Sequence, residues 1–130
     1  MKRPALLDAS FLIDLERETA RDGPGPATRF LVSLCGRPIA VSVVTVAELL
    51  EGAVDERAAL ASLQRFAIQG LHVAQAQRCA RLQRRASRRL SDSDAWIIAT
   101  AESIDADVVG ADRGAFERLG DRYLRYRQAR

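Results

Sequence analysis

The stretch ALLDASFLI, residues 5–13, contains the transition that decides the fold of this chain. It opens with a short apolar run at Ala5–Leu7, stops at Asp8, and continues from Ser10 with apolar side chains at helical spacing. An acidic residue therefore lies where a predicted strand ends and a predicted helix begins. Open α/β sheets bind ligands outside the carboxyl ends of their strands, so Asp8 is a candidate functional residue.

Strand-like and helix-like segments continue to alternate after this first unit. Further strands are expected at Ile39–Val43, Leu71–Val73, Val108–Val109 and Tyr123–Tyr126. Helices are expected over Thr28–Leu34, from Thr45, after a cap at Asp55, over Gln75–Leu90, over Asp94–Ile104 behind a Ser93 cap, and briefly around Phe116. This order predicts one α/β domain over residues 1–130, with a mainly parallel sheet of four to five strands between layers of helices.

Composition limits the class of protein. The chain has 130 residues, a net charge of +3 and one His, and Lys2 is its only lysine. Cys35 and Cys79 have the spacing of neither a disulfide framework nor a zinc site, which favours a reducing cytoplasm. Since no apolar run approaches the roughly 20 residues that span a bilayer, we expect a soluble protein without a membrane segment.

Acidic residues recur where predicted strands end or predicted helices begin. They are Asp8, Glu48, Asp94 and Asp112, with Asp92 two residues before Asp94. The carboxyl ends of neighbouring parallel strands share one edge of a sheet, so these side chains can converge. Mg²⁺ and Mn²⁺ prefer carboxylate and water ligands, so the pattern predicts a site for one of these ions.

Each acidic residue also has an ordinary structural explanation. Asp8 could cap the helix that follows it, and Thr45–Glu48 has the form of a capping box. Asp92 and Asp94 could stabilise a helix N-terminus, and Asp112 could be a turn residue before a glycine. Taken singly, the residues leave these alternatives open.

Four segments together resemble the motifs of the PIN domain family. They are LDASFLI at 7–13, VSVVTVAELLEG at 41–52, DSDAWIIATA at 92–101 and VVGADR at 108–113. The resemblance covers nearly the whole chain. Among PIN domains, single-domain chains of this size look most like the VapC-type toxins of toxin–antitoxin pairs, which implies a ribonuclease that depends on Mg²⁺ or Mn²⁺.

The resemblance also implies roles for individual residues. The positions that match the family's acidic catalytic and metal-binding residues are Asp8, Glu48, Asp94 and Asp112. Asp92 matches an additional position that holds an acidic or amide side chain in some members, and Ser10 matches a small hydroxyl beside the first acid. Gly110 departs from the pattern, because relatives often have Thr or Ser there, and it puts the role of Asp112 in doubt.

The same resemblance implies an RNA substrate, a small antitoxin that covers the site, and a homodimer of the toxin. Six arginines could add a phosphate-binding track or could form an ordinary solvated face of one helix: Arg78, Arg81, Arg84, Arg85, Arg88 and Arg89. A noncatalytic RNA-binding module is the alternative function. A phosphoacceptor receiver is disfavoured, because receivers use a lysine late in the chain.

Overall fold

A computed structural model describes residues 2–21, 23–111 and 113–127. Five strands form one sheet in the order β3-β2-β1-β4-β5, and every pair of neighbours is parallel. The strands are β1 (Ala5–Leu7), β2 (Ile39–Ser42), β3 (Ala67–Gln69), β4 (Asp107–Gly110) and β5 (Tyr123–Arg125). The prediction of an α/β fold with a parallel sheet is confirmed.

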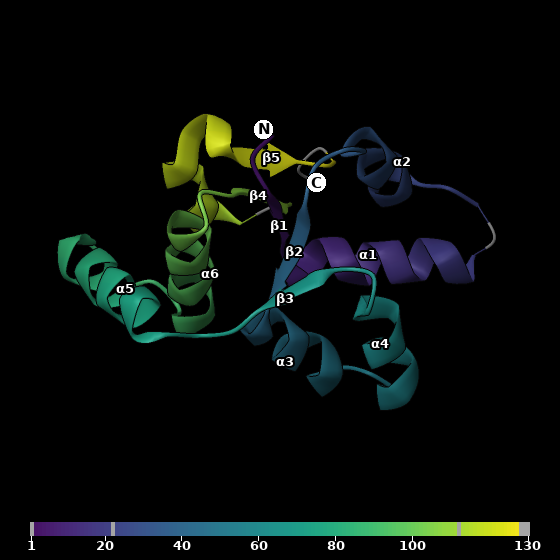
Figure 1. Ribbon diagram of the computed structural model, residues 1–130, viewed down its shortest axis with the longest axis horizontal. Helices are drawn as coiled ribbons and strands as arrows, with labels where there is room; N and C mark the ends of the chain where they lie inside the picture. Colours follow the sequence, from purple (N-terminus) through teal and green to yellow (C-terminus); the bar gives the residue numbers. More distant parts are fainter. Residues whose placement is uncertain (1, 22, 112, 128–130) are drawn as a thin grey trace.

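Helices connect these strands and cover both faces of the sheet (Figure 1). They are α1 (Ala9–Ala20), α2 (Pro26–Ser33), α3 (Val43–Glu51), α4 (Glu56–Leu63), α5 (Val73–Arg85), α6 (Asp92–Ser103) and the 3₁₀ segment η1 (Gly114–Arg122). In the described part of the chain, none of these helices is both long enough and apolar enough to cross a membrane.

Alternate residues of the central strands enter two separate cores, as the period of two along a strand requires. On one face, Leu7, Val41 and Val109 pack with side chains of α1, α2 and α4. On the other face, Leu6 and Val108 pack with α6 and η1. These strands are buried on both faces, which explains why they are apolar without alternation.

The topology brings the ends of three strands to one place. The chain proceeds from β1 outward through β2 to β3, and later returns to the other side of β1 to add β4 and β5. The direction of sheet growth therefore reverses between β1 and β4, and this switch point is where open parallel sheets bind ligands. The Asp8 N–H donates to the Val109 carbonyl at 2.9 Å and ties the two strand ends together.

Several predicted boundaries were wrong. The helix α3 begins at Val43, capped by Ser42, instead of at Thr45, so Val43 does not belong to the preceding strand. Ser91 rather than Ser93 caps α6. The helices α2 and α5 each begin two residues before the predicted start, and α5 ends at Arg85 instead of Leu90.

The third strand was also misplaced. It is Ala67–Gln69 rather than Leu71–Val73. The strand β3 lies at the edge of the sheet with Ala67 and Ile68 exposed, so it lacks the apolar signature by which the central strands were recognised. Leu71 and Val73 are apolar but exposed.

A carboxylate of α1 caps the beginning of α2. Glu18 accepts hydrogen bonds from the N–H groups of Gly25, Ala27 and Thr28 at 2.9, 2.9 and 2.8 Å. Burial raises the pKa of Glu18, but these hydrogen bonds outweigh it and lower the pKa below its ordinary value. Gly25 is required for this contact, because a Cβ on it would lie 2.5 Å from Glu18 Cδ.

We expect Gly25→Ala to lower the free energy of unfolding by about 1–2 kcal/mol, the usual size of a lost helix cap. The added methyl group would push the Glu18 carboxylate away from the three N–H groups it holds. Gly23→Ala is the matched control, because a Cβ there meets no atom within 4 Å. Urea denaturation of both variants measures the difference, and equal stabilities would show that Glu18 is not an effective cap.

Candidate metal centre

Asp8 follows β1 directly and is deeply buried, with 1% of its surface exposed. Its backbone is at the N-cap position of α1, but its side chain makes no capping hydrogen bond. Instead, Asp8 Oδ2 accepts from Ser10 Oγ at 3.2 Å and from Arg113 Nε at 3.3 Å. Capping therefore does not explain the carboxylate of Asp8.

Glu48 lies in α3, the helix that follows β2, and its side chain is 28% exposed. The capping-box explanation fails, because Ser42 caps this helix and Thr45 is buried inside it. Burial raises the pKa of Glu48 above its ordinary value, and the charge of Asp8 raises it further. Arg113 lowers this pKa without cancelling those effects, so Glu48 lies in a region of surplus negative charge.

Asp94 enters the cluster from the first turn of α6. Ser91 Oγ accepts from the Asp94 N–H at 3.2 Å, so the cap of this helix is a serine and the Asp94 carboxylate is available for other contacts. Asp94 Oδ1 accepts from Arg113 Nη1 at 3.2 Å, and the side chain is 15% exposed.

Arg113 joins the three carboxylates. Its guanidinium reaches Asp8 and Asp94 by hydrogen bonds and has Nη2 at 3.9 Å from Glu48 Oε2. Burial lowers the pKa of Arg113, but the three negative charges outweigh that effect and raise it. Sequence reasoning missed this residue, whose one signal was its place as the last residue of the VVGADR segment that resembles the PIN family motif.

Two of the carboxylate oxygens are left without partners. Asp8 Oδ1 and Glu48 Oε1 are buried and have no hydrogen bond in the described part of the chain. The hydroxyl of Thr45 is buried and also has no partner among the described residues, and Thr45 is three residues before Glu48 on the same face of α3. Buried oxygens without partners are costly unless a ligand satisfies them, and oxygen donors of this kind fit Mg²⁺ or Mn²⁺.

The carboxylates do not by themselves form a ready ligand set. Across residues 2–21, 23–111 and 113–127, no three acidic, His or Cys side chains are grouped closely enough to hold one metal ion. The guanidinium of Arg113 lies among Asp8, Glu48 and Asp94. The residues present have the right chemistry for a metal, but in this arrangement an internal cation contacts them.

The other predicted site residues are placed differently. Asp92 is exposed and accepts from Arg89 at 2.8 Å, so the structure does not bring it to Arg113. Asp112 lies outside the described residues, and its metal role stays a prediction. Gly110 lies beside Asp8, and a Cβ on it would be 3.4 Å from Asp8 Oδ2, so a side chain here would contact the first acid.

A separate cluster of charges lies at the amino ends of the strands, opposite the candidate site. Asp107, at the start of β4, is buried and accepts from Arg37 at 2.7 Å and from Arg122 at 3.1 Å. Lys2 lines a pocket at the same ends of the strands, together with Arg3 and Arg37. The only lysine therefore lies at the amino ends of the strands, with Asp107 and not with Asp8, Glu48 and Asp94.

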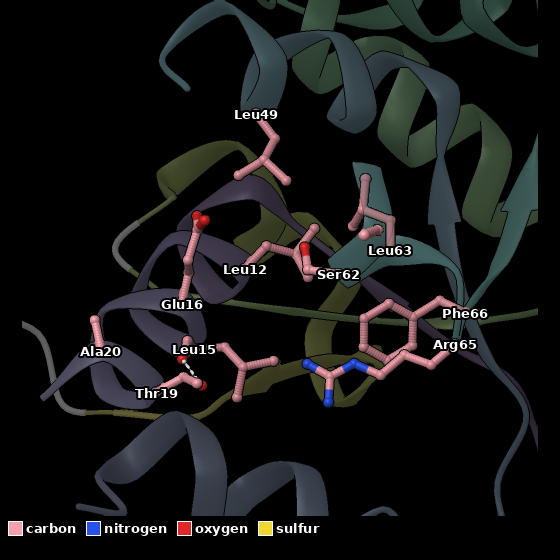
Figure 2. A pocket seen from close by; sticks show the side chains of 11 residues that line it. Leu12, Leu15, Glu16, Thr19, Ala20, Leu49, Ser62, Leu63, Arg65 and Phe66 are labelled. Carbon is pink, nitrogen blue, oxygen red and sulfur yellow. Dashed lines mark hydrogen bonds between the residues drawn. The ribbon is translucent and has the colours of Figure 1, made fainter. Parts of the chain in front are cut away.

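An apolar pocket of about 490 Å³ opens between α1, α3 and α4. Figure 2 shows Leu12, Leu15, Leu49 and Phe66 among its lining side chains, with Glu16 at its side. A neighbouring groove of about 430 Å³ shares Glu16 and Leu49 with it and also includes Glu48. The apolar pocket therefore shares lining residues with a groove that reaches one acid of the cluster, Glu48.

Solved structures share this fold over nearly the full chain. A toxin–antitoxin complex from Klebsiella pneumoniae is 25% identical, with a TM-score of 0.79 over 95% of this chain and 98% of that chain. VapBC-5 from Mycobacterium tuberculosis is 25% identical, with a TM-score of 0.61 over 99% of both chains. VapC20 from the same organism, a toxin that cleaves the sarcin–ricin loop, is 24% identical, with a TM-score of 0.64 over 89% of this chain and 95% of that one.

No curated protein sequence matches the chain significantly. The PIN domain family nevertheless matches residues 5–122 of the chain. That range begins at β1, ends with η1, and includes Asp8, Glu48, Asp94 and Arg113. The chain belongs to the PIN domain family.

Proposed function

We propose that this protein is a metal-dependent endoribonuclease and the toxin of a toxin–antitoxin pair. The observation that carries the proposal is the meeting of three carboxylates at the switch point of the sheet. Two of their oxygens, Asp8 Oδ1 and Glu48 Oε1, are buried and have no partner within the described part of the chain. Membership of the PIN domain family and the similarity to solved toxin–antitoxin complexes support it.

In this proposal, Asp8, Glu48 and Asp94 hold Mg²⁺ or Mn²⁺, and Asp112 completes the set by family resemblance. The bound ion would supply charge stabilisation at the scissile phosphate and would lower the pKa of an attacking water. Ser10 holds Oδ2 of Asp8 by its hydroxyl and so fixes the orientation of the carboxylate. Hydrolysis would leave a 5′-phosphate and a 3′-hydroxyl.

RNA would be held in part by the arginines of α5. Arg78, Arg81 and Arg85 line one pocket with Leu82 and Glu102, where α5 packs on α6. Arg78 is 3.9 Å from Glu102, and both side chains are 43% exposed, so this pair leaves the guanidinium accessible. Arginine binds phosphate through paired N–H donors, which suits this surface to the backbone of a structured RNA.

The antitoxin is the second partner in this proposal. The similar structures include toxin–antitoxin complexes. The apolar pocket and the neighbouring groove lined by Glu48 offer a surface that one polypeptide could cover. Such coverage would keep RNA from the carboxylates. A homodimer of the toxin also belongs to the proposal.

The noncatalytic RNA-binding alternative keeps one observation in its favour, the guanidinium of Arg113 among the carboxylates. A metal-removal experiment separates the two functions. We expect the purified chain to cleave a structured RNA in Mn²⁺ or Mg²⁺, to lose cleavage in excess EDTA, and to regain it when Mn²⁺ is restored. Gel electrophoresis of end-labelled RNA measures this, and RNA binding without cleavage in Mn²⁺ would favour the noncatalytic module.

A further inference from the structure

Arg113 is the one described cation in contact with all three carboxylates of the candidate site. Its three nitrogens divide among them: Nε contacts Asp8, Nη1 contacts Asp94, and Nη2 faces Glu48. A fork of donors that spans three acids stabilises carboxylates that would otherwise repel one another. We propose that Arg113 is the resident counter-cation of this site, which a divalent ion must displace in order to bind.

Shared oxygens are the first argument for displacement. Asp8 Oδ2 and Asp94 Oδ1, which receive hydrogen bonds from Arg113, belong to the same carboxylates that would hold the ion. A divalent ion requires oxygens at about 2.0–2.6 Å and repels a guanidinium placed against the same groups. The two cations therefore compete for one set of negative charges.

The second argument is that Arg113 satisfies the cluster incompletely. One guanidinium faces three carboxylates, and among the described residues Asp8 Oδ1 and Glu48 Oε1 stay buried without partners. The distance of 3.9 Å to Glu48 is long for an ion pair with a hydrogen bond. A doubly charged ion can supply what the arginine does not, so exchange favours the metal when it is available.

The third argument is that the side chain of Arg113 can leave the carboxylates toward solvent. Its side chain is 32% exposed, whereas Asp8 is buried, so the guanidinium enters the cluster from the solvent side. Arg113 precedes η1, and its side chain makes no contribution to capping that helix. Leaving the carboxylates would therefore not require rearrangement of the sheet.

This inference rests on the proposed metal site and makes Arg113 a positioning residue that sets the affinity for the ion. The test is Mn²⁺ binding by isothermal titration calorimetry, with wild type, Arg113→Gln and Arg118→Gln compared after EDTA treatment and dialysis. Arg118 is the matched control, since it is an exposed arginine of η1 that donates to the Ala115 carbonyl at 3.0 Å. Both variants lose one positive charge.

We expect Arg113→Gln to bind Mn²⁺ about tenfold more tightly than wild type, because the internal competitor is gone. Arg118→Gln should bind within about twofold of wild type, because a surface charge at a distance is largely screened by salt. The metal-free Arg113→Gln protein should melt below wild type and should gain more melting temperature from Mn²⁺, since its carboxylates lack a counter-cation until the ion arrives.

Arg113→Lys protects the test against a variant that fails to fold. Lysine keeps the charge but presents a single ammonium instead of a fork, so its Mn²⁺ affinity should lie between those of wild type and Arg113→Gln. Equal or weaker Mn²⁺ binding by both Arg113 variants, with binding intact in wild type, would overturn the inference and leave the metal site standing. Absence of Mn²⁺ binding in all proteins would overturn the metal site itself.

Discussion

Asp94→Asn is expected to reduce cleavage of structured RNA by at least about a hundredfold, the usual size of the loss when a catalytic carboxylate is neutralised. Asparagine keeps the volume of aspartate and leaves the Ser91 cap of α6 intact, because that cap involves the Asp94 N–H and not its side chain. The negative charge that faces Arg113, and that would face a metal ion, is lost. The effect should therefore fall on activity and not on folding.

The matched control for this variant is Asp121→Asn, which neutralises an exposed aspartate of η1. Initial cleavage rates in Mn²⁺ measure activity, and circular dichroism melting verifies that both variants fold. Asp121→Asn should cleave at the wild-type rate. If Asp94→Asn also cleaved within about threefold of wild type, the nuclease activity would not come from this cluster.

The central part of the fold was predictable because its signals are local and strong. The runs that became β1, β2 and β4 are apolar on both faces, and helices on each side bury them. Asp8 follows β1, and Glu48 lies in the helix after β2, so a parallel sheet with adjacent β1 and β2 suffices to bring them together. The order of the strands decides the site, and the alternating elements predict a parallel sheet without that order.

Two helix starts were predicted wrongly because two residues near each start are both suitable N-caps. Ser91 and Ser93 are both good caps two residues apart, and the residue type alone does not distinguish Ser91, which caps α6, from Ser93. Likewise, Ser42 and Thr45 are both suitable caps, and Ser42 caps α3. The edge strand β3 pairs on one side only and is largely exposed, so apolar patterning could not locate it.

The role of Arg113 could not be predicted from spacing. Its long side chain reaches Asp8, which is 105 positions earlier in the chain, and Asp94, which is 19 positions earlier. No periodic pattern records contacts of that kind. The same holds for Asp92, whose sequence position beside Asp94 is compatible with the cluster but whose side chain pairs with Arg89 on the surface.

The second large effect is expected from Asp8→Asn, which should remove most of the stabilisation that Mn²⁺ gives the protein. A ligand that binds only the folded state stabilises it by about 2.7 kcal/mol at a concentration of 100 times its Kd. In a domain of this size, that corresponds to a rise in melting temperature of roughly 10 °C. Asn keeps a neutral oxygen in place of Asp8 but binds a hard cation far more weakly than a carboxylate does.

The metal-free proteins should melt within a few degrees of each other, because two consequences of Asp8→Asn oppose one another. In the wild type, burial and repulsion by Asp8 raise the pKa of Glu48. Loss of the Asp8 charge removes this repulsion. The same loss deprives Arg113 of an ion-pair partner at 3.3 Å. A difference that develops only as Mn²⁺ is added would therefore report on ligation and not on the stability of the starting fold.

Thermal melting of wild type and Asp8→Asn across a Mn²⁺ titration at fixed ionic strength is the most direct test of the acidic cluster as a metal site. We predict that the melting temperature of wild type rises with Mn²⁺ by roughly 10 °C near saturation, while that of Asp8→Asn rises by much less. Equal rises in the two proteins would contradict the account, because the buried carboxylate at the end of β1 would then not be a ligand.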